Sequence, residues 1–246
     1  MENIKMRTTI NMATFPPRIN GLERRIKELA PQCDLMRIYM NGYKKWPKHI
    51  PLPSNVEYIL APGKLDKGSQ GKLHWLDGEP GYYMTVDDDI CYPSDYVKAH
   101  VKANDRYHNK FITAFHGQRF RIQDLHPAPL KKEASGVRKM FQYCGFLAFD
   151  TAVHMVGNGL MCCVPSTLGL SSDAVRGPKD SGDDEDIALF AQRTKTTMVV
   201  IKHMSEWIKP DNEIWPIEAS FRNKKFTQLQ NEKLQTCRRW VLNPIK

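Results

Sequence analysis

The chain has 246 residues, of which 41% are hydrophobic, and carries a formal net charge of +9. A chain of this length can bury one large core, so we expect a single domain over residues 1–246. Residues 1–8 are polar and basic, and no run of about 18 apolar residues occurs. These features argue against a signal peptide and a transmembrane segment. We therefore expect a soluble, cytoplasmic protein or one such domain of a larger polypeptide.

The positive charge is compatible with a nucleic acid, an anionic membrane surface or a phosphorylated ligand. The sequence has no helix-turn-helix, zinc-finger or RNP signature, and its basic residues are not clustered with aromatic ones, so we expect no nucleic-acid partner. The six cysteines show neither a CxxC pair nor the spacing of zinc ligands. This pattern favours reduced thiols, with Cys162 and Cys163 as packing residues.

Short apolar runs alternate with segments of helical periodicity. Leu22, Ile26 and Leu29, for example, share one face of a helix that follows an apolar strand and ends at Pro31. Such alternation predicts an α/β fold with a mostly parallel sheet flanked by helices. In chain order, we expect strands at 8–12, 35–40, 56–60, 82–86, 111–115, 144–149 and 197–201, and helices at 22–30, 95–107, 186–193 and 226–241.

Two long segments, 116–137 and 157–182, lack a clear period. Long aperiodic stretches within a compact domain are commonly functional loops, so we expect both to line the active site. The alternative is an ordinary surface connection. That alternative is weaker for the second segment, because it leads directly into the acidic run 183–186.

Three consecutive acids, Asp87, Asp88 and Asp89, follow the apolar run 82–86. Open parallel sheets bind ligands beyond the carboxyl ends of their strands, so this triplet is a candidate site. Adjacent carboxylates need a cation, and a hard divalent ion binds both carboxylate and phosphate oxygens. The alternative is an acidic turn that caps the next helix, but such a turn needs no buried strand before it.

The segment YYMTVDDDICYP, residues 82–93, resembles the DxD segment of family-2-like GT-A glycosyltransferases, which have a Rossmann-like fold. The resemblance extends more weakly over 8–203. It implies transfer of a sugar from a nucleotide-sugar donor, usually a UDP-sugar, to a saccharide or glycan acceptor. It also implies Mn²⁺ or Mg²⁺ as cofactor, a nucleotide-binding half at 1–115, and an acceptor-side half with a helical C-terminal segment at 116–246.

The same resemblance implies where the nucleotide and the metal bind. In the family, the loop after the first strand holds the base and ribose, and residues 13–18 match that loop. The alternative is a proline turn that starts a helix. Residues 68–72 resemble the glycine-lysine segment before the DxD motif. The implied nucleotide contacts are Ala13, Thr14, Phe15, Arg18, Gly71, Lys72, Asp87, Asp88 and Asp89, and the implied metal ligands are Asp87, Asp89 and His203.

A second acidic run, Asp183-Asp184-Glu185-Asp186, resembles the family's ED motif at a helix start. In inverting members, the Asp of that motif deprotonates the acceptor hydroxyl. The register Glu185-Asp186 makes Asp186 the expected base, with Asp184 in reserve. The alternative is a helix start stabilised by the helix dipole, although four acids exceed what capping requires. For His203, the alternative is a hydrogen-bonded structural role.

Two other functions are open on the sequence. A sugar-phosphate nucleotidyltransferase would also use acids, a metal and a nucleotide, but it needs a glycine-rich loop after the first strand. Residues 13–18 contain no glycine. A basic nucleic-acid-binding module would bind in a salt-sensitive way, without a divalent metal and without sugar transfer.

Overall fold

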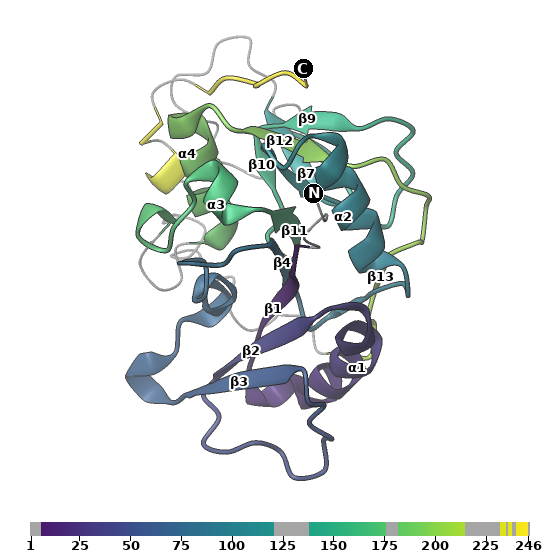
Figure 1. The fold of residues 1–246 in the computed structure, drawn as a ribbon, viewed down its shortest axis with the longest axis vertical. Coiled ribbons are helices and arrows are strands. Elements are labelled where there is room, and N and C mark those ends of the chain that lie inside the picture. The colour runs from purple at the N-terminus through teal and green to yellow at the C-terminus, as the bar shows by residue number, and fades with distance from the viewer. Residues whose placement is uncertain are drawn as a thin grey trace, which may run out of the picture.

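The computed structural model describes residues 6–120, 138–175, 182–214, 232–234, 236–237 and 240–245. These residues form an α/β fold around one eight-stranded sheet, in the order β3-β2-β1-β4-β11-β6-β12-β9 (Figure 1). The strands are β1 (Thr8–Thr14), β2 (Leu35–Asn41), β3 (Val56–Ala61), β4 (Tyr82–Val86), β6 (Phe111–Ala114), β9 (Thr151–Val153), β11 (Leu160–Cys163) and β12 (Thr197–Val200).

The sheet is mostly parallel, as predicted. β1 pairs in parallel with β2 and β4, β2 with β3, and β6 with β12. β11 lies antiparallel between β4 and β6, and β9 is antiparallel to β12. The carboxyl ends of β1 and β4 therefore lie together at one edge, which is where parallel sheets bind ligands.

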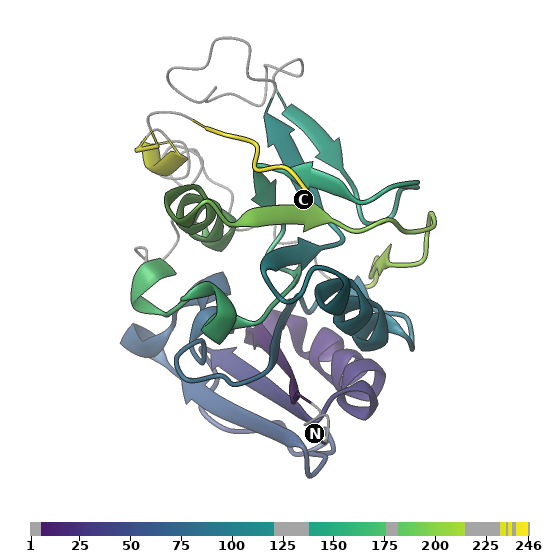
Figure 2. The ribbon, with the colours of Figure 1, turned by 45° about the horizontal axis from the view of Figure 1, so that its top comes forward.

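Helices cover both faces of the sheet (Figure 2). α1 and α2 pack against one face, whereas α4 packs against the other. Two smaller sheets complete the described fold, β10-β7-β8 and β13-β5. The remaining elements are α1 (Ile19–Leu29), α2 (Tyr96–Arg106), α3 (Pro165–Leu168), α4 (Asp183–Thr194), η1 (Pro16–Arg18), η2 (Ala30–Gln32), η3 (Gly63–Leu65), η4 (Gly68–Leu73), η5 (Asp173–Val175), β5 (Ile90–Cys91), β7 (Gly117–Phe120), β8 (Arg138–Phe141), β10 (Met155–Val156) and β13 (Lys209–Pro210).

The core divides along the sheet because strand side chains alternate between its faces. In β4, Met84 packs with α1 and α2, whereas Tyr83 packs on the α4 side. Cys162 and Cys163 of β11 separate in the same way, and both are buried free thiols. Their predicted role as packing residues is confirmed. β4 and β11 are buried on both faces, so their sequences are nearly continuous apolar runs.

Two sequence predictions about this region are wrong. Residues 144–149 form turns and bends with one bridge, between Leu147 and His203, and the strand follows as β9. Segment 157–182 is not one long loop, because it contains β11, a central strand of the sheet. An apolar run predicts a strand only where tertiary pairing is available, and that pairing is invisible in a single sequence.

Other predictions fall partly beyond the described residues. Segment 116–137 begins with β7, and its residues 121–137 lie outside the part that the structure describes. Of the helix predicted at 226–241, residues 232–234 are helical, but 236–237 and 240–241 are not, so the prediction is wrong for those four residues. Residues 226–231, 235 and 238–239 lie outside the described part of the chain. Within the described ranges, the structure has no helix that is long and apolar enough to cross a membrane.

Candidate functional site

The acidic triplet directly follows β4, at the edge where β1 also ends. Met12 of β1 pairs with Val86, the last residue of β4. Thr14, at the end of β1, therefore reaches the first turn beyond β4. The three carboxylates are placed at this edge by the parallel pairing of β1 and β4.

Asp88 is the buried member of the triplet, with 4% of its side chain exposed. It accepts a hydrogen bond from Thr14 Oγ1 at 2.7 Å, and its Oδ1 lies 2.5 Å from Arg18 Nη1. Burial raises the pKa of Asp88 to about 6, although Arg18 favours the charged form. Asp88 thus fastens the triplet to the loop that follows β1.

The two outer carboxylates remain partly exposed, at 38% for Asp87 and 31% for Asp89. Arg18 Nη2 lies 2.9 Å from Asp89 Oδ2. Burial and the charge of Asp87 raise the pKa of Asp89. The outer pair therefore repel each other, and a cation between them would relieve that repulsion.

Lys72 of η4 joins this triplet to the second acidic run. Its side chain is 4% exposed, and its Nζ lies 2.6 Å from Asp87 Oδ1 and 3.2 Å from Asp183 Oδ2. Burial opposes the charge of the amine, but Asp183 and Asp87 outweigh it and raise the pKa of Lys72. Two acidic segments that are distant in the sequence thus share one buried cation.

The turn before β11 closes the other side of this cluster. The side chain of Asn158 donates to Asp183 Oδ2 at 2.6 Å, and its backbone N–H donates to Asp184 Oδ1 at 2.6 Å. Gly159 packs against Asp87 so closely that a Cβ there would lie 1.8 Å from Asp87 Oδ2. Only glycine fits at this position while Asp87 keeps its place.

The acids at the start of α4 differ in how they are held. Both oxygens of Asp186 are in contact with polar groups, Oδ2 with Gln70 Nε2 at 3.0 Å and Oδ1 with Lys233 Nζ at 2.5 Å. Glu185 is buried, whereas Asp184 is partly exposed. Burial raises the pKa of Asp186, although Lys233 opposes this. Burial and the charge of Asp183 raise the pKa of Asp184 well above its ordinary value.

The other predicted residues lie at varying places around the cluster. Ala13 is the last residue but one of β1, directly before Thr14. The Arg18 guanidinium lies 5.5 Å from the centre of the Phe15 ring. Gly71 packs on the ring of Tyr39, where a Cβ would approach within 2.5 Å.

His203 is buried in an arrangement that leaves little room for a metal. Its Nδ1 lies 2.7 Å from the carbonyl oxygen of Ile201, and its Nε2 lies 3.2 Å from that of Gln142. Ligation of an ion would require the ring to leave at least one of these oxygens. The predicted metal role of His203 gains no support from these contacts.

Two residues near the triplet were missed in the sequence. His116 follows β6, and its buried Nδ1 has no hydrogen-bond partner among the described groups. Burial lowers the pKa of His116, and the nearby charge of Asp87 opposes that shift. Burial and the charge of Asp89 raise the pKa of Tyr143 to about 12. Only the position of His116 after an apolar strand could have indicated it.

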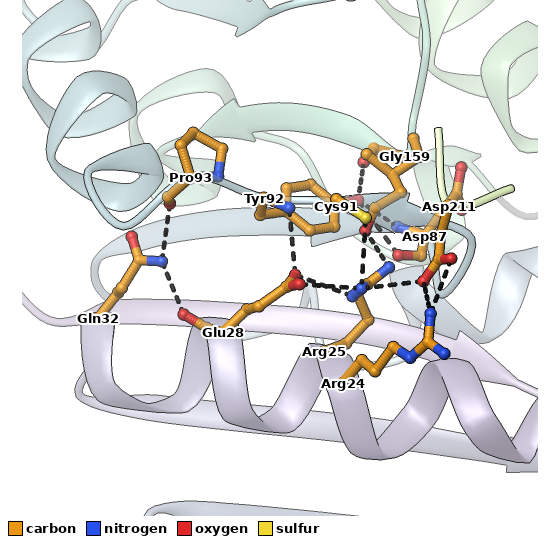
Figure 3. A network of polar contacts seen from close by, with 11 residues as sticks. Arg24, Arg25, Glu28, Gln32, Asp87, Cys91, Tyr92, Pro93, Gly159 and Asp211 are labelled. Atoms are coloured by element: carbon orange, nitrogen blue, oxygen red, sulfur yellow. Dashed lines mark hydrogen bonds and ion pairs between the residues drawn. The ribbon is translucent and has the colours of Figure 1, made fainter. Parts of the chain in front are cut away.

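A buried ion pair holds the backbone of the acidic turn from the side of α1 (Figure 3). Arg25 is fully buried, donates to the backbone oxygen of Ile90 and lies 3.2 Å from Asp211 Oδ2. The N–H of Asp211 donates to the backbone oxygen of Asp89 at 2.8 Å. Arg24 lies 3.0 Å from the same Asp211 carboxylate. Two arginines of α1 thus fix the segment around β13 against the acidic turn.

Tyr92 ties the acidic turn to the glycine turn before β11. Its buried hydroxyl accepts a hydrogen bond from the N–H of Asp87 at 2.8 Å and donates to the backbone oxygen of Gly159 at 2.9 Å. The Tyr92 N–H donates to Glu28 of α1 at 3.1 Å, next to Arg25 (Figure 3). Tyr92 therefore connects the acidic turn, the glycine turn before β11 and helix α1.

A divalent ion at the acidic triplet would find few protein ligands and would have to complete its shell with groups from a ligand and with water. Among the described residues, no three His, Cys, Asp or Glu side chains form a group that could hold a metal. Asp87 and Asp89 alone supply two partly exposed carboxylates. Mg²⁺ is commonly bound in this way, by one or two carboxylates together with substrate phosphates and water.

Neither a scan against known protein families nor a search of curated proteins finds a match for this chain. The functional argument therefore depends on the fold and on the geometry of the site.

The first prediction concerns the ion pair between Arg25 and Asp211. Asp211→Asn removes the buried one of the two carboxylates that pair with the guanidinium of Arg25, the other being that of Glu28, and it keeps the size of the side chain. Breaking a buried pair from one side commonly costs about 3 kcal/mol or more, so we expect the free energy of unfolding to fall by about that amount. Equilibrium urea unfolding measures it.

The matched control is Glu213→Gln. It removes the exposed carboxylate that pairs with Arg24, which is the neighbour of Arg25 on α1. An exposed pair contributes about 0 to 1 kcal/mol, so the control should change stability only slightly. If both substitutions have equally small effects, the buried pair does not hold the turn.

Proposed function

We propose that this chain is a metal-dependent glycosyltransferase of the GT-A type, which transfers a sugar from a nucleoside-diphosphate sugar to a hydroxyl of a saccharide or glycan acceptor. UDP is the nucleotide we expect. The observation that supports this proposal is the meeting of two acidic segments at the carboxyl end of β4. Asp87 and Asp183 contact the same buried amine, that of Lys72. A site with clustered carboxylates and a fixed cation suits a diphosphate that arrives with a metal ion.

Asp87 and Asp89 are the residues that would hold Mn²⁺ or Mg²⁺. When bound, the ion would neutralise the negative charge of the diphosphate leaving group as the bond between the diphosphate and the sugar breaks. Asp88 is excluded from the ligand set because it is buried against Thr14 and Arg18. We also leave out His203, whose ring nitrogens lie against carbonyl oxygens.

The loop after β1 has a different division of roles from the one that the sequence suggested. Arg18 is 1% exposed and pairs with both Asp88 and Asp89, so we assign it to holding the acidic turn. Phe15, next to this guanidinium, is our candidate to flank the base of the nucleotide. Lys72 lies beside Asp87, where its charge would also stabilise the departing diphosphate.

For the base, the contacts favour Asp184 over Asp186. Both oxygens of Asp186 are held, one of them by the amine of Lys233, so it is better suited to positioning the start of α4. Asp184 is partly exposed beside Asn158. The pKa of Asp184 is also raised, which makes its carboxylate a stronger proton acceptor.

The reaction that follows is a direct displacement. The acceptor oxygen forms a bond to the anomeric carbon, its proton passes to the carboxylate of Asp184, and the bond from that carbon to the diphosphate oxygen breaks. The nucleoside diphosphate leaves with the electron pair of the broken bond. Attack from the face opposite the leaving group inverts the anomeric carbon.

The second prediction is that tight UDP binding requires Mn²⁺ or Mg²⁺. Asp89→Asn removes one of the two exposed carboxylates, so we expect it to weaken metal-dependent UDP binding by about tenfold or more, which corresponds to about 1.4 kcal/mol. Isothermal titration calorimetry with UDP, with Mn²⁺ and then with EDTA, is the measurement.

Asp88→Asn is the control within the same triplet, because it preserves both exposed carboxylates. It should lower stability through the loss of charge beside Arg18, but affect UDP affinity less than Asp89→Asn. Equal UDP affinity of the unsubstituted protein with Mn²⁺ and with EDTA would remove the metal from the mechanism.

The third prediction separates the two candidate bases. Asp184→Asn should lower kcat by about 10²- to 10⁴-fold with little change in metal-dependent UDP binding, because a positioned base is worth that much in rate. Asp186→Asn should lower kcat less and lower thermal stability more, since it leaves Lys233 beside a neutral group.

The pH profile provides a second readout for Asp184. The base must be ionised to accept a proton, and the pKa of Asp184 is raised. We therefore expect kcat to increase with pH, and the midpoint of that increase to lie well above the ordinary pKa range of a carboxylic acid. The opposite order of the two kcat losses would return the role to Asp186. Unchanged kcat in both variants would place the base elsewhere.

A further inference from the structure

Large apolar side chains are exposed on β8 and on the two neighbouring loops 142–150 and 202–206. The exposed fraction is 65% for Phe146, 79% for Phe149, 65% for Met204 and 43% for Met140. We call these four residues the apolar rim. Single exposed apolar side chains are ordinary, but several on one surface indicate a contact with another molecule.

Hydrogen bonds hold the two loops of the apolar rim together. Leu147 and His203 exchange backbone hydrogen bonds of 3.0 and 3.1 Å, which places Phe146 next to Met204 along the joined loops. A further bond runs from the N–H of Glu206 to the oxygen of Cys144 at 2.9 Å. Both views show loops 142–150 and 202–206 side by side at the margin of the molecule (Figures 1 and 2). The rim is therefore presented by a fixed scaffold.

Exposed lysines flank the apolar rim. Lys139 lines a cavity of about 340 Å³ together with Met140 and Phe146, and Lys202 is exposed next to the contact with Asp150. Among the described residues, two acids near the apolar rim have positively charged partners. Asp150 pairs with Arg106 and accepts a hydrogen bond from Tyr107 at 2.6 Å, and Glu206 lies 3.8 Å from Lys209. The local surface is thus apolar and positively charged.

We propose that the apolar rim docks this protein on an anionic membrane surface. The two phenylalanine and two methionine side chains enter the boundary between headgroups and acyl chains, while Lys139 and Lys202 contact anionic headgroups. Binding at a membrane surface grows with the apolar area that is buried and with the attraction to anionic lipids, so the two contributions act together.

A second copy of the chain is a poorer occupant of this surface. At about 200 Å² per large side chain, the exposed parts of the apolar rim amount to about 500 Å². A stable interface needs about 800 Å² from each partner. Lysines at the edges of both copies would also face each other and repel.

Docking would bring the acidic site close to the bilayer. Tyr143, from the same loop as Phe146 and Phe149, packs edge-on against His116 near the acidic triplet, with the two ring centres 5.8 Å apart. An acceptor attached to a lipid would then be presented beside the site. Membrane docking itself requires neither metal nor sugar transfer, so it stands or fails independently of the proposed function.

Sedimentation with phospholipid vesicles tests the proposal, in the presence of EDTA. The protein should bind vesicles that contain phosphatidylserine and bind pure phosphatidylcholine vesicles more weakly. Replacing Phe146 and Phe149 together by Ser should lower the partition constant by about 100-fold or more, because two large apolar side chains no longer enter the acyl boundary. Lys139→Gln should lower it by about fivefold on anionic vesicles, with no effect on neutral ones.

Leu65→Ser is the matched control, because Leu65 is 61% exposed but lies on η3, outside the apolar rim. It should leave the partition constant unchanged, and circular dichroism should show the same fold for every variant. Absence of vesicle binding, or equal binding of the double variant, overturns the proposal. A dimer in solution that is lost in the double variant would also overturn the proposal. So would a double variant whose KM for a soluble acceptor changes while its vesicle binding does not.

Discussion

The buried amine of Lys72 is the contact on which the arrangement of the site depends. It is almost completely removed from solvent and lies between Asp87 and Asp183. A buried amine without carboxylates is costly, and the carboxylates without the amine would repel each other. Because each charge needs the others, the end of β4, the turn η4 and the start of α4 are held at one place. This shared charge turns separate acidic segments into one site.

The fold could be predicted where the local pattern and the final environment agree. β4 and β12 are buried on both faces, so their short apolar runs predicted strands correctly. β11 has a similar run, Leu160–Cys163, but its position in the middle of the sheet depends on antiparallel pairing with β4 and β6. The apolar residues of 144–149 predicted a strand that the structure does not have. Phe146 and Phe149 are exposed to solvent there and do not pack in a sheet.

The sequence indicated where acidic residues would gather, but not how their charges would be paired. Acids at strand and helix ends are visible in the sequence, since the edge of a parallel sheet is a known place for ligands. The sequence could not show which charges pair. Arg18 was expected at the nucleotide but is buried against Asp88, and Asp186 was expected as a base but is held by Lys233. Asp211, which supports the acidic turn, lies far along the chain and has no local motif.

Paramagnetic broadening by Mn²⁺ tests most directly whether the two acidic segments form one metal and diphosphate site. Amide NMR spectra of isotope-labelled protein would be recorded with UDP, first with Mg²⁺ and then with added Mn²⁺. We predict that the amide signals of Asp89, Gly159 and Asp183 broaden together, and that this is lost when Asp87 and Asp89 are both changed to Asn. Broadening at Asp89 that spares Gly159 and Asp183, or broadening only elsewhere in the chain, would contradict a shared site.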